Sequence, residues 1–186
     1  MNRRIPAALA AVAALGVTVL AGGPADAATK HKPHPKPNTI ETHGALKIKI
    51  NGYIKDAQSF FPGTLNVRSG ATVKLINKSK GGEPHSLSLL KASALPKTGD
   101  EIEQCAPCGP LIAAHQANPE TGQVGVPLYD TGGPGFDTEG DATTAGDSIF
   151  LPPHGKVTFK VTAKKGTTLH FFCAIHPWMQ GKIRVK

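Results

Sequence analysis

Residues 173–179 read Cys-Ala-Ile-His-Pro-Trp-Met, and they carry three different metal-binding side chains. Cys173 offers a thiolate, His176 an imidazole and Met179 a thioether. An apolar run precedes the stretch and a second strand-like run follows it, which places the three side chains on a loop between strands. Thiolate and thioether stabilise reduced copper, and imidazole suits both of its oxidation states. The stretch therefore predicts a copper site at one end of a β-structure.

A second histidine is needed to complete such a site, and His85 is the best candidate. It follows the Gly-rich residues 81–84 and opens a predicted strand. Two histidines and a cysteine in one plane, with a weakly bound axial methionine, form the blue-copper electron-transfer centre. We therefore predict one type 1 copper ion, held by His85, Cys173, His176 and Met179.

Short runs of β type recur on both sides of these residues. Residues 46–50 alternate between aliphatic residues and lysine, which is typical of a half-buried strand. Residues 156–162 and 167–173 are expected to pair across the turn at 163–166. The further predicted strands are residues 64–68, 71–77, 86–90 and 181–186. Many short strands separated by Gly and Pro turns indicate an all-β sandwich or barrel.

Residues 91–147 interrupt this rhythm with a long insertion rich in Gly, Pro, Asp and Thr. A loop of this length is unusual in a compact domain and is often functional or partly disordered. We expect at most a short helix near residues 111–116. Cys105 and Cys108 lie in the insertion, and the chain has three cysteines. We expect these two to form a disulfide, with an accessory metal site as the alternative.

Five acidic residues gather in the second half of the insertion. They are Asp130, Asp137, Glu139, Asp141 and Asp147. Oxygen ligands of this kind can hold calcium, but their spacing fits no recognised calcium loop. We therefore expect a solvated acidic loop.

The N-terminal residues have the order of a secretory signal. Arg3 and Arg4 precede an apolar run, and Ala25-Asp26-Ala27 fits a small-residue cleavage site. We predict a signal peptide over residues 1–27 and an extracytoplasmic location, secreted, periplasmic or in the cell envelope. No second apolar run follows, so no transmembrane segment is expected in the mature chain.

Residues 28–44 are predicted to be a linker rich in His, Pro and Lys, followed by a single domain over residues 45–186. The linker contains His31, His34 and His43. A Pro-rich basic stretch is extended and cannot build a core, so a solvated tether is favoured over a loose copper-capturing segment. The formal charge of the whole chain is +8, but the lysines are scattered and no nucleic-acid motif is present. Nucleic acid is therefore not an expected partner.

The ligand stretch, with Pro177 and an aromatic residue at Trp178, resembles the cupredoxin family of type 1 blue copper proteins. It is most similar to the amicyanin, plastocyanin and pseudoazurin members. Pro84-His85 before a strand resembles the upstream ligand of that family, and Ser86 stands where relatives often have Asn. The resemblance covers roughly residues 45–90 and 148–186. It implies a Greek-key, cupredoxin-like β-sandwich, with the insertion at 91–147 before the last strands.

The function implied is single-electron transfer between redox protein partners, whose identity the sequence does not name. The alternative is an extracytoplasmic copper-binding or delivery protein. An enzyme is not expected, because multicopper oxidases and nitrite reductases resemble one another in having His beside the ligand Cys, whereas Phe172 and Ala174 flank Cys173. We also expect a monomer.

The resemblance further implies that one ring edge of His176 is exposed at the protein surface. Trp178 would then lie in an exposed apolar patch where a partner docks. His170 is expected to be an ordinary surface or packing residue on the other face of its strand.

Overall fold

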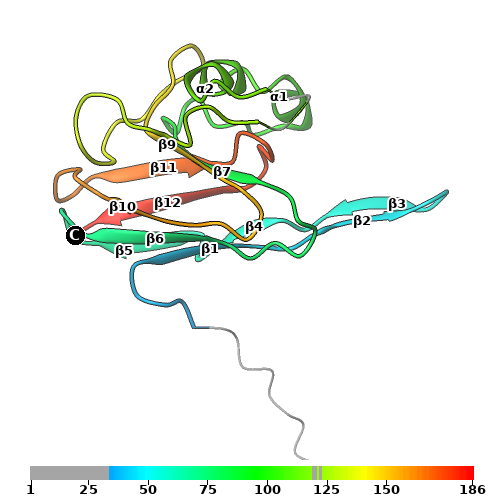
Figure 1. The fold of residues 1–186 in the computed structure, drawn as a ribbon, viewed down its shortest axis with the longest axis horizontal. Coiled ribbons are helices and arrows are strands. Elements are labelled where there is room, and N and C mark those ends of the chain that lie inside the picture. The colour runs from blue at the N-terminus through cyan, green and yellow to red at the C-terminus, as the bar shows by residue number, and fades with distance from the viewer. Residues whose placement is uncertain (1–33, 119–120, 122) are drawn as a thin grey trace, which may run out of the picture. The chain divides into compact units, whose positions relative to one another are not determined.

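The computed structural model describes residues 34–118, 121 and 123–186. The predicted signal peptide and residues 28–33 of the predicted linker, including His31, lie outside the described residues. Residues 34–186 form one unit in which two β-sheets pack face to face, with two short helices on the outer side of one sheet (Figure 1). Within the part of the chain that is described, no helix has the length and apolar character needed to cross a membrane.

One layer is a four-stranded sheet and the other a six-stranded sheet. The first has the order β10, β6, β1, β4, formed by Lys156–Lys160, Thr72–Asn77, Thr39–His43 and Ser59–Phe61. The second has the order β5, β12, β11, β7, β9, β8, formed by Thr64–Val67, Gln180–Val185, Thr168–Phe172, His85–Leu89, Ser148–Leu151 and Leu128–Tyr129. The chain changes sheet between β4 and β5, β5 and β6, β6 and β7, β9 and β10, and β10 and β11. The predicted all-β sandwich is confirmed, and these crossovers give it its Greek-key character.

The core lies between the two sheets and follows from alternation along the strands. Side chains at every second position of a strand point to the same face. Val73 and Leu75 of β6 face Leu65 and Val67 of β5 in one buried cluster. Phe171 of β11 belongs to the same cluster and packs edge-on against Phe60 at 5.0 Å between ring centroids.

The predicted pairing of residues 156–162 with 167–173 is wrong. Strand β10 pairs with β6, while β11 pairs with β12 and β7 in the other sheet. The short link between them crosses from one layer to the other, a distance of about 10 Å. Two strands that are neighbours in sequence are thus separated by the core.

The predicted linker is wrong over its last residues. Thr39–His43 form strand β1, which pairs in parallel with β6 and antiparallel with β4. Ile40 is fully buried in the core, so the folded domain begins before residue 45. His43 belongs to this strand, and its Nε2 atom lies 3.1 Å from a carboxylate oxygen of Glu41. The Pro-rich composition of residues 30–37 concealed the strand that follows it.

Residues 46–56 form a separate hairpin of β2, Leu46–Lys49, and β3, Tyr53–Asp56. These two strands pair with each other in a sheet of their own, and they extend beyond the two large sheets (Figure 1). The predicted half-burial of residues 46–50 is wrong, since Ile48 has 65% of its surface exposed. Alternation gives the strand two faces, but among the described elements none covers either face.

The insertion is more ordered than its composition suggested. It contains α1, Gly99–Gln104, and α2, Cys108–Ala114, and the short strand β8. Thr98 caps α1 in a capping box with Glu101, and α2 lies close to the helix expected at 111–116. Gly140 and Gly146 lie back to back, because a Cβ on Gly146 would lie 2.2 Å from the backbone nitrogen of Gly140. Close backbone approach of this kind explains part of the glycine content.

Candidate metal centre

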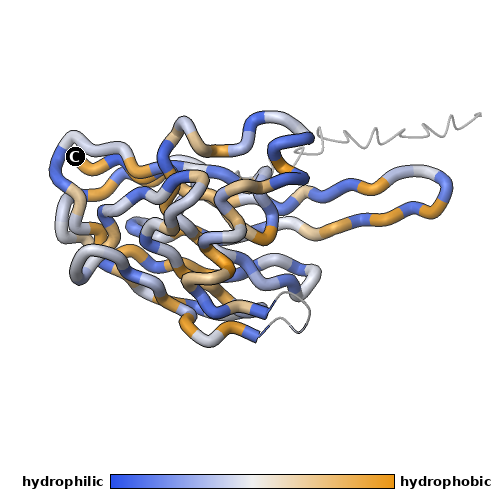
Figure 2. The backbone as a smooth tube through the Cα atoms, turned by 90° about the horizontal axis from the view of Figure 1, so that it is seen from above, coloured by the Kyte–Doolittle hydropathy of each residue, from blue (hydrophilic) through white to orange (hydrophobic). Residues whose placement is uncertain are grey.

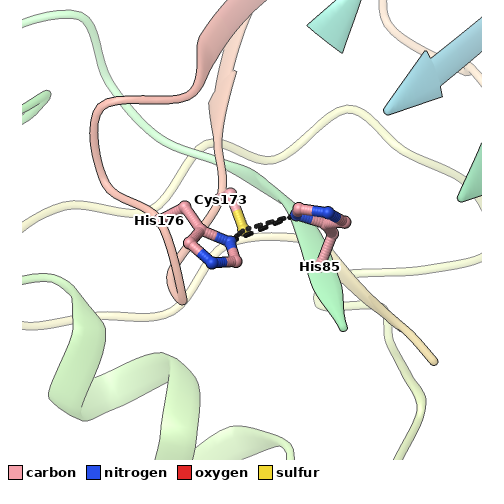
Figure 3. Close-up of side chains that lie close together, drawn as sticks. All are labelled: His85, Cys173 and His176. Atoms are coloured by element: carbon pink, nitrogen blue, oxygen red, sulfur yellow. Dashed lines mark hydrogen bonds between the residues drawn. The ribbon is translucent and has the colours of Figure 1, made fainter. Parts of the chain in front are cut away.

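Three potential metal ligands meet at the end of the six-stranded sheet. His85 opens β7, while Cys173 and His176 lie on the loop that joins β11 to β12. Their donor atoms all lie within 4.8 Å of one another. Cys173 Sγ is 3.8 Å from Nδ1 of His85 and 3.7 Å from Nδ1 of His176, and the two Nδ1 atoms are 3.2 Å apart. Figure 3 shows both imidazoles turned toward the sulfur.

Burial holds all three groups in their neutral forms. Burial, with a smaller contribution from the neighbouring His176, lowers the pKa of His85 to about 4. Burial also lowers the pKa of His176 and raises the pKa of the Cys173 thiol. A metal cation among these atoms would compensate for the loss of the thiol proton, since coordination deprotonates a thiol. The electrostatic environment therefore suits a bound cation and disfavours a free thiolate.

Met179 completes the set of four predicted residues and is buried on the same loop. Its backbone N–H donates to the carbonyl oxygen of His176 at 2.8 Å, and its own carbonyl accepts from Cys173 N–H at 3.0 Å. These two bonds close the loop on itself. The loop therefore holds Cys173, His176 and Met179 at fixed places relative to one another.

Ser86 joins this loop to the strand that carries His85. The backbone N–H of Ser86 donates to Cys173 Sγ at 3.2 Å, and its hydroxyl accepts from Ala174 N–H at 2.7 Å. A hydrogen bond to the sulfur stabilises negative charge on it. Ser86, at the position where relatives often have Asn, thus joins the two segments that carry the predicted ligands.

A chain of hydrogen bonds sets the tautomer of His85. Asn77 donates from Nδ2 to the carbonyl oxygens of Glu83 and Pro152, so its Oδ1 atom is the acceptor that faces Thr42. Thr42 donates to that oxygen at 2.9 Å, and Ser79 donates to the Thr42 hydroxyl at 3.2 Å. The Ser79 oxygen, 2.6 Å from His85 Nε2, is therefore left as an acceptor. The proton of His85 lies on Nε2, and the lone pair of Nδ1 faces the sulfur.

Gln58 covers the outer edge of His176. Its Nε2 atom lies 3.1 Å from Nε2 of His176 and also donates to Asp56 Oδ2 at 3.2 Å. His176 retains 8% of its surface exposed, so the expectation of an exposed ring edge is wrong. Neither Gln58 nor Ser79 could be found from the sequence, because both are ordinary polar residues far from the ligand motif along the chain.

Trp178 and Ile175 are the apolar residues of the ligand loop that reach the surface. Trp178 has 41% of its surface exposed and packs edge-on against His176 at 5.3 Å between ring centroids. Ile175 is exposed to a similar degree. The exposed part of the loop is therefore apolar and lies directly beside a predicted ligand.

The insertion packs against the other side of the ligand loop. Leu111 and Cys108 of α2 form a buried cluster with Leu90 and Phe172. The sulfur of Cys108 lies 3.1 Å from the carbonyl oxygen of Ala174. Cys105 and Cys108 form the predicted disulfide, so neither sulfur is a free thiolate for an accessory metal. Across the described residues, His85, Cys173 and His176 make the one group of His, Cys or carboxylate side chains close enough to share an ion.

The acidic residues of the insertion organise its backbone. Asp147 is fully buried and accepts from the N–H groups of Thr131, Asp137 and Thr138, each at 2.8 Å. Burial raises the pKa of Asp147 despite these three bonds. The expectation of a solvated acidic loop is wrong for this residue. Glu139 instead accepts from the backbone N–H of His170, and Nδ1 of the His170 imidazole lies 3.1 Å from the same carboxylate oxygen.

The donor set fits a single type 1 copper ion. It combines two neutral imidazoles, one thiol that a cation can deprotonate, and a buried methionine on the same loop. Soft sulfur with imidazole is the combination that copper prefers, whereas calcium and magnesium prefer oxygen ligands.

No family model matches the chain, and no curated protein matches it. The solved structures that the chain is similar to include cupredoxins, at low sequence identity. A purple cupredoxin from Nitrosopumilus maritimus shares 14% identity, with 80% of this chain and 98% of that chain covered and a TM-score of 0.40. Auracyanin A, a blue copper protein from Chloroflexus aurantiacus, shares 20% identity over 81% and 100% of the two chains, also at 0.40. An auracyanin from Roseiflexus castenholzii shares 18% over 82% and 99%, at 0.40.

Proposed function

We propose that His85, Cys173, His176 and Met179 hold one copper ion, and that the protein carries single electrons between redox partners outside the cytoplasm. The observation that carries this proposal is the convergence of three buried donors with both Nδ1 atoms facing the sulfur. Copper bound there would supply a one-electron couple between its two oxidation states.

The surrounding hydrogen bonds support this role because they fix the donors before any change of charge. Ser79 orients His85, Gln58 orients His176, and the Ser86 N–H stabilises charge on the Cys173 sulfur. Outer partners of this kind set the orientation and basicity of metal ligands. Donors that are held rigidly rearrange little when the charge changes by one, which favours rapid electron exchange.

Copper delivery is the second candidate function, and the structure leaves it with fewer supporting features than the sequence suggested. A delivery protein needs exposed groups that pass the ion to an acceptor. The Cys105–Cys108 disulfide removes one pair of such groups, which leaves His31 and His34 of the basic segment. The buried, rigid donor set favours retention of the ion. A carrier keeps its copper through repeated oxidation and reduction, whereas a delivery protein loses it to an acceptor chelator.

Reconstitution with copper tests the central assignment. We expect one copper per chain and an intense sulfur-to-copper absorption in the oxidised protein. Cys173→Ser removes the thiolate and should abolish that absorption. The matched control is the double variant Cys105→Ser/Cys108→Ser, which changes the other two cysteines and should stay blue. A blue Cys173→Ser protein would show that the assignment is wrong.

The role of Met179 is tested by Met179→Leu. A weak axial ligand tunes the reduction potential more than it controls affinity. We expect this variant to keep its copper and colour and to have a higher reduction potential, because the apolar side chain favours the less charged reduced ion. Complete loss of copper would contradict an axial role.

The orientation of His85 is tested by Ser79→Ala. This change leaves the Nε2 proton of a buried imidazole without its acceptor. Removing such a partner weakens metal binding by about 10- to 100-fold. Competition with a copper chelator measures the affinity, and Ser69→Ala, at an exposed serine, is the control. Equal copper affinities in the two variants would show that Ser79 does not orient His85 for copper binding.

A further inference from the structure

The β2–β3 hairpin has one apolar face that nothing in the described structure covers. Its register places Ile48 opposite Ile54 and Leu46 opposite Asp56. Ile48 and Ile54 are 65% and 75% exposed, and Ile50 at the turn is more exposed still. Figure 2 shows hydrophobic and hydrophilic residues alternating along the hairpin as it extends from the sandwich. Large aliphatic side chains in such a contiguous exposed patch usually mark a contact surface.

The opposite face of the hairpin is cationic. The same register places Lys47 opposite Lys55, and Lys49 opposite Tyr53. Like charges directly across a strand pair destabilise it. None of these three lysines forms an ion pair with a described residue that would offset the repulsion. The hairpin therefore carries two arrangements, exposed aliphatic residues and facing lysines, that work against its own stability.

A second copy of the chain is a poor occupant of this surface. A stable protein interface takes about 20–30 residues from each side. The apolar face and the adjoining turn together offer four aliphatic residues, Leu46, Ile48 and Ile54 on the face and Ile50 at the turn. A groove on another protein would likewise cover the apolar face and leave the lysines of the opposite face unexplained.

We propose that the hairpin inserts its apolar face into the surface of an anionic lipid bilayer. In an interfacial amphipathic element, aliphatic residues enter the boundary between headgroups and acyl chains, and lysines on the polar face lie at the depth of the phosphates. A two-stranded ribbon is thin enough for Lys47, Lys49 and Lys55 to reach phosphates from its upper face. Tyr53, beside them, is a residue type enriched at this depth. This occupant accounts for both faces of the hairpin.

The N-terminal sequence provides a second attraction to the same surface. Residues 30–37 read Lys-His-Lys-Pro-His-Pro-Lys-Pro and carry three lysines. A lysine near an anionic surface contributes about 1 kcal/mol to binding, and stable attachment generally takes two signals. The proposal does not depend on copper, since it concerns residues that are not ligands.

Vesicle binding tests the proposal with the exported form of the full protein, its N-terminus established by mass spectrometry. The probes are vesicles of phosphatidylcholine alone and of phosphatidylcholine mixed with phosphatidylglycerol. We expect co-sedimentation with the mixed vesicles, weakened by salt. The double variant Ile48→Thr/Ile54→Thr keeps β-branched residues in both strands and should bind at least about tenfold more weakly. Leu128→Thr, at an exposed leucine of β8, is the matched control and should bind as the wild type does.

Three outcomes would overturn the proposal. The first is absence of binding to the mixed vesicles. The second is binding that the isoleucine variant leaves unchanged, because the basic segment alone would then hold the protein at the surface. The third is self-association, seen by sedimentation velocity without lipid and lost in the isoleucine variant, which would make the hairpin an interface between copies. Copper colour in every variant, read from the same samples, keeps this test separate from that of electron transfer.

Discussion

The insertion at residues 91–147 and the hairpin at residues 46–56 both extend the two-sheet sandwich, and they differ in how they meet the ligand loop. The insertion has a disulfide, a fully buried aspartate and a leucine in a buried cluster with Phe172, which precedes the ligand loop. The hairpin has four exposed aliphatic residues, and Asp56 at its base accepts a hydrogen bond from Gln58, which in turn contacts His176. Aliphatic residues occur in both regions, so their burial depends on whether an opposing apolar surface is available.

That difference implies unequal contributions to stability. Truncating a buried side chain leaves a cavity and loses its transfer free energy, while truncating an exposed one changes little. The insertion should therefore behave as part of the core and the hairpin as an appendage. Four measurements test this contrast, ordered from the largest expected effect to the smallest.

Leu111→Ala should lower the free energy of unfolding by about 2–5 kcal/mol, because Leu111 is 2% exposed and packs against Phe172 and Cys108. Denaturant unfolding of the copper-free protein measures the change. Ile112→Ala, at the next and partly exposed position of the same helix, is the control and should have a much smaller effect. Equal losses from both variants would mean that α2 does not pack as the structure describes.

Asp147→Asn should lower the free energy of unfolding by about 1–3 kcal/mol. The amide replaces one acceptor oxygen by a donor that faces backbone N–H groups, and the loss of a buried partner costs that much. Asp100→Asn, at an exposed aspartate of the same insertion, is the control and should have a much smaller effect. Chemical denaturation measures both variants, and equal losses of stability would contradict a structural role of the buried Asp147 carboxylate.

The third measurement is the pH dependence of stability through His115. Burial lowers the pKa of His115 from its ordinary value of 6.5, and its two nitrogens contact Val126 O and Ser148 Oγ. Below pH 6.5 the unfolded chain binds a proton that the folded chain does not, so stability falls as the pH falls. Thermal unfolding of copper-free protein should show a shallower acid loss in His115→Gln than in the exposed control His154→Gln. Parallel curves for the two variants would contradict this assignment.

Ile54→Ala should change the free energy of unfolding by no more than about 0.5 kcal/mol, because Ile54 is 75% exposed and lies in the two-stranded sheet of β2 and β3. The comparison variant is Ile149→Ala, at a buried isoleucine of β9. If Ile54→Ala lowered the free energy of unfolding by several kcal/mol, the hairpin would have to be packed against another surface in solution.

Much of the sandwich could be predicted from alternation. Strands near residues 64–68, 71–77 and 181–186 follow apolar side chains at every second position, and the structure has them there. The hairpin shows the limit of this pattern. Alternation predicts that a strand has an apolar and a polar face, but it does not predict whether another element covers the apolar face. The prolines before strand β1 concealed it in the sequence. The glycine content of the insertion likewise concealed its order, because some of those glycines are required by close backbone packing.

Pairing between strands was less predictable than the strands themselves. Neighbouring strands β10 and β11 lie in different sheets, since a link of a few residues can cross the core as easily as it can turn. The same limit applies to the residues around the site. Ser79 and Gln58 meet the two imidazoles from separate segments, and no local pattern distinguishes them from other polar residues.

The sequence by itself determined the donor types and their order on the ligand loop, because Cys173, His176 and Met179 are so close along the chain that one turn must hold them together. It also indicated the strand that brings His85, and the Cys105–Cys108 disulfide. Only the tertiary structure decided that Ser79 sets the His85 tautomer, that Gln58 covers His176, and that the described part of the chain leaves the hairpin uncovered. These features depend on contacts between distant segments, and such contacts follow from how whole layers pack.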